Sequence, residues 1–449
     1  MSAERFASSD PHARIAIAVL RAIFGDTYAR EFSIELWEGT RVPAANAERF
    51  VLRVNAPGAL RAAFALPVDL STARAFGAGL LDIEGDLEAA VDAFYRAGAP
   101  RGRRLFKLLK LLSRLPKIAP AGMREARLHG RVHSRARDRA AIGFHYDQPI
   151  EFYRSFLDRD MVYSCAYWEG DAESLDDAQS AKLDYTLRKL RLRPGERLLD
   201  IGCGWGALVV RAAERFGARA LGITLSAPQC DEARRRIAAA GLADRARVEL
   251  RDYRELAGER FDKIVSVGMF EHVGRARFAG YFRAAYESLN EGGLFLNHAI
   301  ADRSGRRGGG RVTTFVKHFI FPDGELVPIS DTLAFAERVG FEVRDVESLR
   351  EHYVRTLRAW VANLERNRDA AIAAAGEQSY RLWRLYMAGS AQGFRVGRIG
   401  VYQSLLARPH AGGRVDLPPT RADLYDAQRE NGRLGSAVSV KGSTRTASP

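Results

Sequence analysis

The sequence predicts an α/β protein with a mostly parallel, Rossmann-like sheet that carries helices on both faces, plus a small N-terminal α+β domain. From about Arg197, short apolar runs alternate with amphipathic stretches, which is typical of strand–helix units wound into a parallel sheet. A glycine-rich turn, GCGWG, follows the first of these runs. The residues before about 100 instead predict two short strands and a helix, which indicates a separate unit.

A length of 449 residues exceeds what one hydrophobic core usually serves, so we expect more than one domain. We place a small α+β domain, a candidate for lipid association, at 1–100 and a basic amphipathic connector at 101–140. The catalytic domain is expected at 141–415. The tail, 416–449, has few large apolar groups and is expected to be partly disordered.

In the first domain, residues 32–56 predict two strands around a turn that contains Gly, Pro and Asn. A helix is predicted from Gly85, with Asp86 near its start. The connector then holds 13 Arg or Lys against Glu125 and Asp138, an excess of 11 positive charges.

The connector also predicts an amphipathic helix over 103–115. Its apolar face would carry Leu105, Leu108, Leu109, Leu112 and Leu115, and its opposite face Arg103, Lys107, Lys110 and Arg114. Two interpretations stay open, because the leucines can pack on a neighbouring domain or enter a membrane interface.

Composition narrows the class of protein. Hydrophobic residues make up 47% of the chain, which excludes a wholly disordered protein, and a net charge of +14 favours anionic partners. The three cysteines, Cys165, Cys203 and Cys230, lack the spacing of a disulfide framework or a zinc site, which predicts a reducing compartment. No apolar run approaches the ~20 residues of a membrane span. We therefore expect a cytoplasmic protein that contacts the inner face of the membrane peripherally.

The strands of the larger sheet are predicted in RLLDI, ARALGITLS, ARVELRDY, FDKIVSVGMF and GGLFLNHAI, with helices over 206–216 and up to Ala240. Ligands bind at the carboxyl ends of the strands in such sheets. The candidate positions are therefore Asp200 to Gly206, Thr224 to Ser226, Asp252, Gly268 to His272, and His298 to Ile300.

The spacing of Gly202, Gly204 and Ala207 satisfies the dinucleotide fingerprint, which alone is weak evidence. A nicotinamide enzyme needs an acidic residue at the end of the second strand, but GITLS offers only Thr224 and Ser226. Asp200, just before the first glycine, would repel a pyrophosphate and attract the cationic groups of S-adenosylmethionine. The loop therefore favours methyl transfer.

At this point the sequence resembles the cyclopropane-fatty-acyl-phospholipid synthases and their mycolic acid relatives, which are class I methyltransferases. The resemblance rests on five segments in order, FHYDQPIEFYRSFLD, MVYSCAYW, LLDIGCGWG, GITLS and IVSVGMFEHVG, and runs from about 145 to 410. It implies binding of S-adenosylmethionine by Tyr163, Ser164, Asp200, Gly202, Gly204, Gly206, Thr224, Leu225, Ser226, Gln229, Asp252 and Tyr253.

The same resemblance implies transfer to the cis double bond of a phospholipid acyl chain. Methylation of an alkene leaves a carbocation, which must be kept from water until a base removes a proton from the new methyl group and the ring closes. The family holds a bicarbonate ion for this step, and the matching residues here are Glu271, His298, Ile300, Tyr353 and Cys165. We expect Glu271 to orient His298 and favour its charged form, and Cys165 to line the site without acting as a nucleophile.

Aromatic faces can stabilise the cation, and Tyr163, Tyr167, Trp168, Phe270 and Tyr353 are candidates, although core packing explains each equally well. Several bacterial family members carry a cysteine where this chain has Ser390, and we include this serine, which fills similar space, among the catalytic candidates. The cationic loop 303–311 suits a phosphate headgroup, or is simply solvated.

Three rival functions remain. A nucleic-acid methyltransferase suits the charge, but the chain has GMFEHVG where enzymes that methylate exocyclic amines usually carry a Pro-Pro-aromatic turn, so no nucleic acid partner is expected. A methyl-branched or methylene lipid product is equally compatible with the residues. A non-catalytic lipid-binding protein is the third alternative. The sequence leaves the oligomeric state open, a homodimer included.

Overall fold

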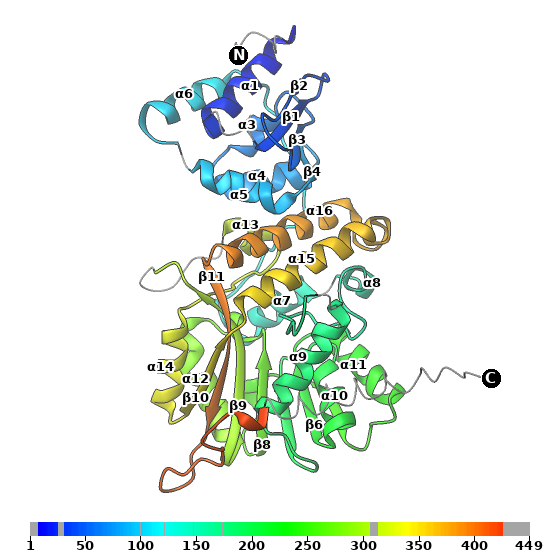
Figure 1. Cartoon of the computed structure of the whole chain (residues 1–449), viewed down its shortest axis with the longest axis vertical. Coiled ribbons are helices and arrows are strands. Elements are labelled where there is room, and N and C mark those ends of the chain that lie inside the picture. Colours follow the sequence, from blue (N-terminus) through cyan, green and yellow to red (C-terminus); the bar gives the residue numbers. More distant parts are fainter. Residues whose placement is uncertain are drawn as a thin grey trace, which may run out of the picture.

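The computed structural model describes residues 8–25, 31–98, 100–120, 122–146, 148–171, 174–305 and 313–424. Within these ranges, two sheets with their own helices are separated by a layer of long helices (Figure 1). The predicted fold class is confirmed, since a mostly parallel sheet with helices on both faces follows a small α+β unit.

The larger sheet has the strand order β10-β11-β9-β8-β5-β6-β7. Its strands are β5 (Arg197–Ile201), β6 (Arg219–Thr224), β7 (Ala246–Leu250), β8 (Phe261–Val267), β9 (Leu289–Asp302), β10 (Glu342–Ser348) and β11 (Ile399–Ala407). Strands β5 to β9 run parallel, and β11 lies antiparallel between β9 and β10. The strand order reverses beside β5, which creates a crevice at the carboxyl ends of β5 and β8.

Alternate residues of each central strand face opposite sides of this sheet. In β5, Leu198 belongs to the core formed with the first group of helices, and Leu199 to the core formed with the second. The first group is α9 (Leu175–Lys189), α10 (Ala207–Phe216) and α11 (Ala227–Ala239), and the second is α12 (Phe278–Ser288) and α14 (Ile329–Val339). The predicted helices after the first two strands are thus confirmed as α10 and α11.

The smaller sheet has the order β2-β1-β3-β4. Its strands are β1 (Phe32–Leu36), β2 (Arg41–Val42), β3 (Phe50–Val54) and β4 (Leu81–Gly85), and its helices are α1 (Pro11–Phe24), α3 (Ala59–Ala63), α4 (Val68–Gly77) and α5 (Leu87–Ala97). The two predicted strands exist, but they pair in parallel because the segment between them forms β2 on the other side of β1. Asp86 caps α5 by accepting from the Ala89 N–H at 2.8 Å, as its position predicted.

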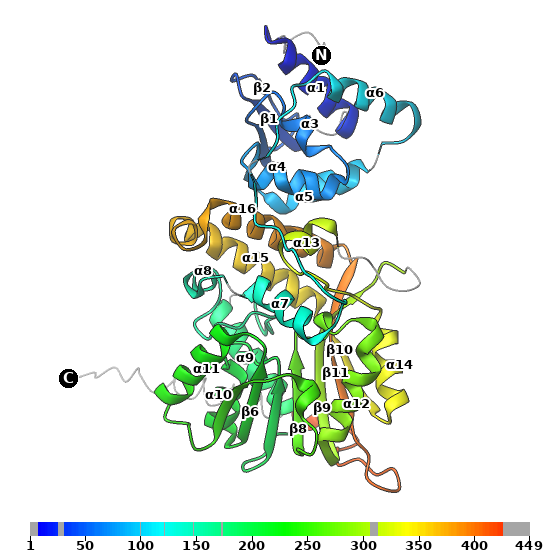
Figure 2. The ribbon, with the colours of Figure 1, turned by 180° about the vertical axis from the view of Figure 1, so that it is seen from behind.

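The predicted connector helix is α6 (Gly102–Ser113), which packs against α1 at the far end of the molecule from the larger sheet (Figure 2). The five leucines expected on one apolar face differ in burial. Leu108, Leu112 and Leu115 are buried in the N-terminal core, whereas Leu105 is 41% and Leu109 is 55% exposed. The helix therefore packs on its own domain and still presents apolar side chains outward. It is followed by α7 (Arg135–Tyr146).

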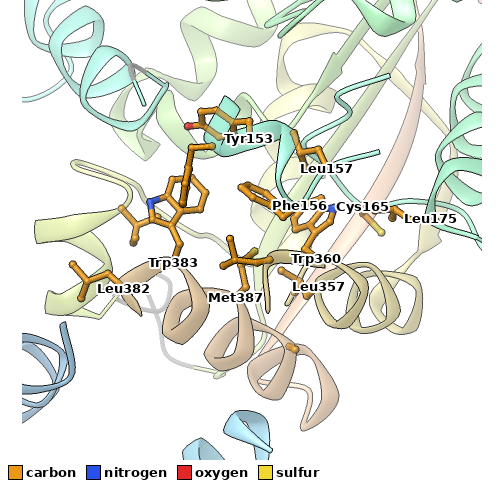
Figure 3. Packing of buried hydrophobic residues seen from close by; sticks show 14 of the residues in the cluster. Tyr153, Phe156, Leu157, Cys165, Leu175, Leu357, Trp360, Leu382, Trp383 and Met387 are labelled. Carbon is orange, nitrogen blue, oxygen red and sulfur yellow. The ribbon is translucent and has the colours of Figure 1, made fainter. Parts of the chain in front are cut away.

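The layer between the sheets consists of α15 (Arg350–Arg366), α16 (Arg368–Arg395), α13 (Thr314–Phe319) and the short α8 (Ile150–Arg154). Figure 3 shows Trp383 and Met387 of α16 beside Phe156 and Trp360, in a core that also contains Cys165. This aromatic cluster fixes α15 and α16 over the carboxyl edge of the larger sheet.

Two predictions bear on the ends of the chain and on membranes. Residues 425–449 of the expected disordered tail lie outside the described residues. Among the helices that are described, none combines the length and the apolar character needed to cross a bilayer.

Candidate active site

A pocket of about 140 Å³ opens at the crevice beside β5. Most of the residues predicted to hold S-adenosylmethionine line it, namely Tyr163, Ser164, Asp200, Gly202, Gly204, Thr224, Leu225, Gln229 and Tyr253. They come from the segment before α9, from the carboxyl ends of β5, β6 and β7 and, for Gln229, from the first turn of α11. The topology thus gathers side chains that are distant in sequence at one edge of the sheet.

Three residues predicted for the same cofactor lie beside the pocket and shape it. Gly206 precedes α10 with a φ of +84°, and a Cβ there would meet Ala233 at 2.9 Å. Ser226 caps α11 by accepting from the Gln229 N–H. Asp252 is 4% exposed, and both its oxygens accept from the Arg254 guanidinium, at 2.8 and 2.5 Å.

The glycine loop fits a bound ligand. Gly204 has a φ of +54°, and a Cβ added there would meet no protein atom within 4 Å, so the free space beside its backbone belongs to the pocket. By contrast, a Cβ on Gly202 would meet Met269 at 2.9 Å. Gly202 is therefore required by the protein's own packing, and Gly204 leaves room for a ligand.

Burial perturbs the charged groups of this pocket. It raises the pKa of Asp200 to about 7, although Lys182 opposes the shift. Burial also lowers the pKa of Lys182 to about 8, and its ammonium donates to the Ser164 hydroxyl at 3.0 Å. An acid and a base therefore face one cavity, which suits a zwitterionic amino-acid group.

Sequence reasoning missed Lys182. A signal existed, because Gln179, Lys182, Thr186 and Lys189 recur at helical spacing on α9 and all four are buried. A polar stripe that faces inward on a helix is unusual enough to mark a site.

We expect S-adenosylmethionine to bind more tightly at pH 8 than at pH 6. Below its pKa of about 7, Asp200 is protonated, and a cationic ligand can pair with it only after that proton leaves. Calorimetry at pH 6 in buffers of different ionisation enthalpy should therefore detect proton release on binding. Asp200→Asn should bind weakly and release no proton, whereas release as large as that of the wild type would assign the proton to another group.

A second, larger cavity of about 810 Å³ adjoins the first. Tyr146, Tyr163, Ser164, Gly268 and His272 line both. All six residues predicted for catalysis line the larger one, namely Cys165, Glu271, His298, Ile300, Tyr353 and Ser390. The structure therefore brings the predicted catalytic set together, next to the cofactor pocket.

The expected pairing of Glu271 with a charged His298 is wrong. One Glu271 oxygen, Oε1, accepts from the Ile300 backbone N–H at 2.7 Å, and His298 Nδ1 instead lies 3.3 Å from Gln403 Nε2. Burial, together with nearby Lys182 and Lys189, lowers the pKa of His298 to about 3. His298 is therefore neutral at physiological pH.

The hydrogen bonds also determine which nitrogen of His298 carries the proton. Lys189 can only donate, and its Nζ lies 3.2 Å from Gln403 Oε1, so the amide nitrogen of Gln403 faces His298 Nδ1. Because Nδ1 accepts this bond, the ring proton is on Nε2. Nε2 has no hydrogen-bond partner among the described residues and is free to donate into the cavity.

Glu271 supplies a matching acceptor. Its Oε2 is buried without a partner among the described residues, and burial raises the pKa of its carboxyl to about 7. Burial also raises the pKa of Tyr353, which keeps its hydroxyl proton. A small oxyanion that also carries a hydroxyl, such as bicarbonate, fits one acceptor and two donors of this kind.

Cys165 matches its predicted lining role. Its thiol lies 3.3 Å from the Ala166 carbonyl and 3.6 Å from the Leu349 carbonyl, and burial raises its pKa, so the sulfur is held as a thiol. Ser390 lines the larger cavity near Tyr386. Cys203 and Cys230 are both buried in the core beside α10 and α11.

Three of the five candidate aromatics are not at the site. Tyr167 stacks on Tyr185 and His352, Trp168 donates to the His352 carbonyl, and Phe270 packs on Phe278. Tyr163 and Tyr353 do line the larger cavity, together with aromatics that sequence reasoning did not select, namely Tyr146, Phe315, Phe321, Tyr386 and Phe394. Of the cationic loop, Arg303 to Gly305 is described and residues 306–311 lie outside the described residues.

Comparison with known proteins identifies relatives of the whole arrangement. The family model for mycolic acid cyclopropane synthetases matches residues 133–404. A probable fatty acid methyltransferase of Pseudomonas putida is 39% identical over 395 residues, which is 87% of this chain and 95% of the relative. Cyclopropane mycolic acid synthase 3 of Mycobacterium tuberculosis is 40% identical over 274 residues, or 59% of this chain and 95% of that protein.

Solved structures agree. The cyclopropane synthase MmaA2 of Mycobacterium tuberculosis gives a TM-score of 0.57 at 36% identity, covering 60% of this chain and 98% of its own. The mycolic acid cyclopropane synthase CmaA1, solved with SAH and CTAB, gives 0.57 at 38% identity, covering 60% of this chain and 97% of its own. The N-terminal domain lies outside the family model, whereas the 395-residue match to the Pseudomonas relative must include part of it.

Proposed function

Because the chain belongs to the mycolic acid cyclopropane synthetase family of S-adenosylmethionine-dependent methyltransferases, we propose that it converts the cis double bond of an unsaturated phospholipid acyl chain into a cyclopropane ring. The observation that carries the proposal is the cavity of about 810 Å³, in which Glu271, His298 and Tyr353 adjoin the cofactor pocket and the remaining lining is largely apolar. An acyl chain needs such a lining, and proton removal needs the polar groups.

S-adenosylmethionine, when bound, supplies the electrophilic methyl group. The loop at Gly204 leaves room for it, and Asp200 and Lys182 offer one charge of each sign to its amino-acid end. The residues shared by the two cavities, Tyr163 and Ser164 among them, then lie at the junction where the donor and the alkene must meet.

Proton removal falls to the group around Glu271. Bicarbonate fits there and, when bound, supplies the base. In our proposal His298 Nε2 and the Tyr353 hydroxyl donate to its oxygens, and Glu271 Oε2 accepts from its hydroxyl. Aromatic side chains and the surrounding apolar lining keep water from the cation until the ring closes.

We propose a phospholipid substrate and not a mycolic acid because of the share of this chain that each relative matches. The Pseudomonas relative, named a probable fatty acid methyltransferase, matches 87% of this chain, whereas the mycobacterial synthase matches 59%. A methylene product uses the same site, but a hydride shift first moves the cation to the carbon that carries the new methyl group, which then loses the proton. A saturated methyl branch would further require a hydride donor.

The test uses the full chain, S-adenosylmethionine and vesicles of monounsaturated phosphatidylglycerol, with fully saturated vesicles as the control. The expected product is an acyl chain that has gained one CH2 unit and resists ozonolysis. An ozonolysis-sensitive product of the same mass would identify the methylene lipid instead. No lipid product in the presence of bound cofactor would overturn the proposal.

We further propose that the enzyme reaches its substrate by peripheral contact with anionic membrane. Helix α6 supports this, because Phe106 is 74% exposed beside the exposed Leu105 and Leu109, on a helix that also carries Arg103, Arg104, Lys107 and Lys110. A basic helix with outward apolar groups binds an anionic interface, at about 1 kcal/mol per basic residue near the surface.

Reversal of Arg103, Arg104, Lys107 and Lys110 to glutamate should therefore weaken co-sedimentation with anionic vesicles and leave S-adenosylmethionine affinity unchanged. Binding by the wild type should also fall as salt rises, since the Debye length shrinks to ~3 Å at about 1 M. The matched control reverses four exposed arginines of the other domain, Arg234, Arg235, Arg245 and Arg247. Equal loss in both variants would show a response to net charge alone and would contradict a role for α6.

A further inference from the structure

The larger cavity does not end at the catalytic residues. It continues past α16 into the N-terminal domain, where its lining comes from α1, β1, β3, α3, α4, β4 and α5. The residues at this end include Phe24, Phe32, Phe50, Leu52, Leu60, Phe64 and Phe94. The interior of the small domain and the catalytic group therefore open into one space.

The passage runs between α5 and α16, which pack side by side (Figures 1 and 2). From α16 it is lined by Gly389, Ser390 and Gly393, and a Cβ on Gly389 would meet no atom within 4 Å. From α5 it is lined by Leu87, Ala90, Val91 and Phe94, which recur on one face of that helix. Small residues on one helix and an apolar face on the other leave a gap whose lining is mostly apolar and includes the Ser390 hydroxyl.

Ion pairs hold the two helices in this alignment. Glu88 of α5 accepts from Arg358 at 2.7 Å and from Arg395 at 2.7 Å. Burial alone would raise the pKa of the Glu88 carboxyl, but the two arginines hold this pKa below its usual value. Asp92, one turn further on, accepts from Gln392 at 2.7 Å and pairs with Arg395 at 3.0 Å. The polar side of α5 thus fixes its position and leaves the apolar side to the cavity.

The lining of the cavity within the N-terminal domain favours an apolar ligand. Among the described residues, the N-terminal domain contributes one charged side chain to the lining, Asp69, and its carboxylate accepts from the Thr314 backbone N–H at 2.6 Å. Arg398 of the catalytic domain also lines the cavity, but its guanidinium stacks on the Tyr95 ring at 3.7 Å. A glycerophosphate placed among the phenylalanines of the N-terminal end would lose its hydration without gaining partners. An unbranched hydrocarbon chain gives up no hydrogen bonds with water when it enters this end, and burial of its apolar surface is favourable.

We propose that the N-terminal domain is the binding chamber for the methyl-terminal segment of the acyl chain, beyond the double bond, and that its depth sets the chain length the enzyme accepts. This deepens the proposed function and rests on it. The family model begins at residue 133, so a catalytic domain of this family is recognised without such a chamber. The N-terminal domain is therefore a part of the substrate site that the matched catalytic domain does not contain.

The test narrows the passage with Ala90→Val, Ala90→Phe and Ala90→Trp. The substrates are phosphatidylglycerols whose double bond stays at one distance from the carboxyl group while the methyl-terminal segment varies. We expect Ala90→Trp to lower turnover of the longest substrate at least tenfold and that of the shortest by less than twofold, with Ala90→Val and Ala90→Phe in between. Ala238→Trp, on an exposed turn of α11, is the matched control.

A second readout does not depend on turnover. The wild type should bind cis-parinaric acid, seen as an increase in its fluorescence, and Ala90→Trp should bind it at least tenfold more weakly with an unchanged melting temperature and S-adenosylmethionine affinity. Equal loss for short and long substrates, or no loss for either, would overturn the chamber. If the wild type converts none of the lipids, the proposed function fails, and unchanged cis-parinaric acid binding in Ala90→Trp would then overturn the chamber separately.

Discussion

Gly204→Val is expected to weaken S-adenosylmethionine binding by about a hundredfold or more, a loss on the order of 3 kcal/mol, and to abolish turnover with it. Gly204 lines the cofactor pocket, and nothing in the protein occupies the space beside its Cα within 4 Å. A valine side chain would fill that space. Calorimetric titration measures the effect, and the wild type should show no binding of NADH under the same conditions.

A valine at Gly204 is also strained by the φ of +54°, so the control must share that strain. Gly241 has a φ of +66°, is exposed and likewise has no atom within 4 Å of a new Cβ, but it lies away from the pocket. Gly241→Val should keep wild-type affinity. If both variants lost affinity equally, backbone strain would explain the effect and the assignment of the pocket would fail.

Glu271→Gln and His298→Ala should lower kcat by about 10²–10⁴-fold, the usual contribution of a positioned acid–base group, with S-adenosylmethionine affinity unchanged. In Glu271→Gln, the amide oxygen can still accept from the Ile300 N–H. The amide NH2 then takes the place of Oε2, so the cavity has a donor where the wild type has an acceptor. His298→Ala removes the Nε2 donor. Tyr353→Phe should show a loss of the same kind, because it removes the other donor.

The measurement is turnover on unsaturated phospholipid vesicles beside calorimetric cofactor affinity. Glu291→Gln is the matched control, since Glu291 lies on the same strand as His298 and is exposed. Near wild-type turnover in Glu271→Gln, His298→Ala and Tyr353→Phe together would place proton removal elsewhere. A fall in cofactor affinity equal to the fall in kcat would assign these residues to binding.

Much of the catalytic set could be predicted because its signals are local. The turn that contains Gly202 and Gly204 directly follows the apolar strand β5, and His298 lies in β9 opposite Val267, the last residue of β8, so pattern and position suffice to put them at one edge of a parallel sheet. The same logic selected Glu271 and Cys165 by motif. Asp252, Ser226 and Gly206, which it also selected, lie beside the pocket and not in its lining, because motif proximity does not say which side of a loop a side chain occupies.

The aromatic candidates failed for a related reason. Tyr167 and Trp168 stand within a motif that carries Cys165, but this segment is neither helix nor strand, so the spacing along it does not predict which way each side chain points. Both contact His352 of α15 instead of the cavity. Tyr386 and Phe394 reach the cavity from a helix whose position the sequence does not fix.

The sequence by itself determined the fold class, the cofactor loop and the absence of a second-strand acid, because each depends on residues within about one strand and one turn. Only the tertiary structure decided the state of His298, whose proton position depends on Gln403 of β11 and Lys189 of α9. It also decided the burial of Lys182 and the joining of the N-terminal core to the active site. Protonation and cavity shape depend on which distant side chains meet in a low-dielectric interior, and chain spacing does not encode that.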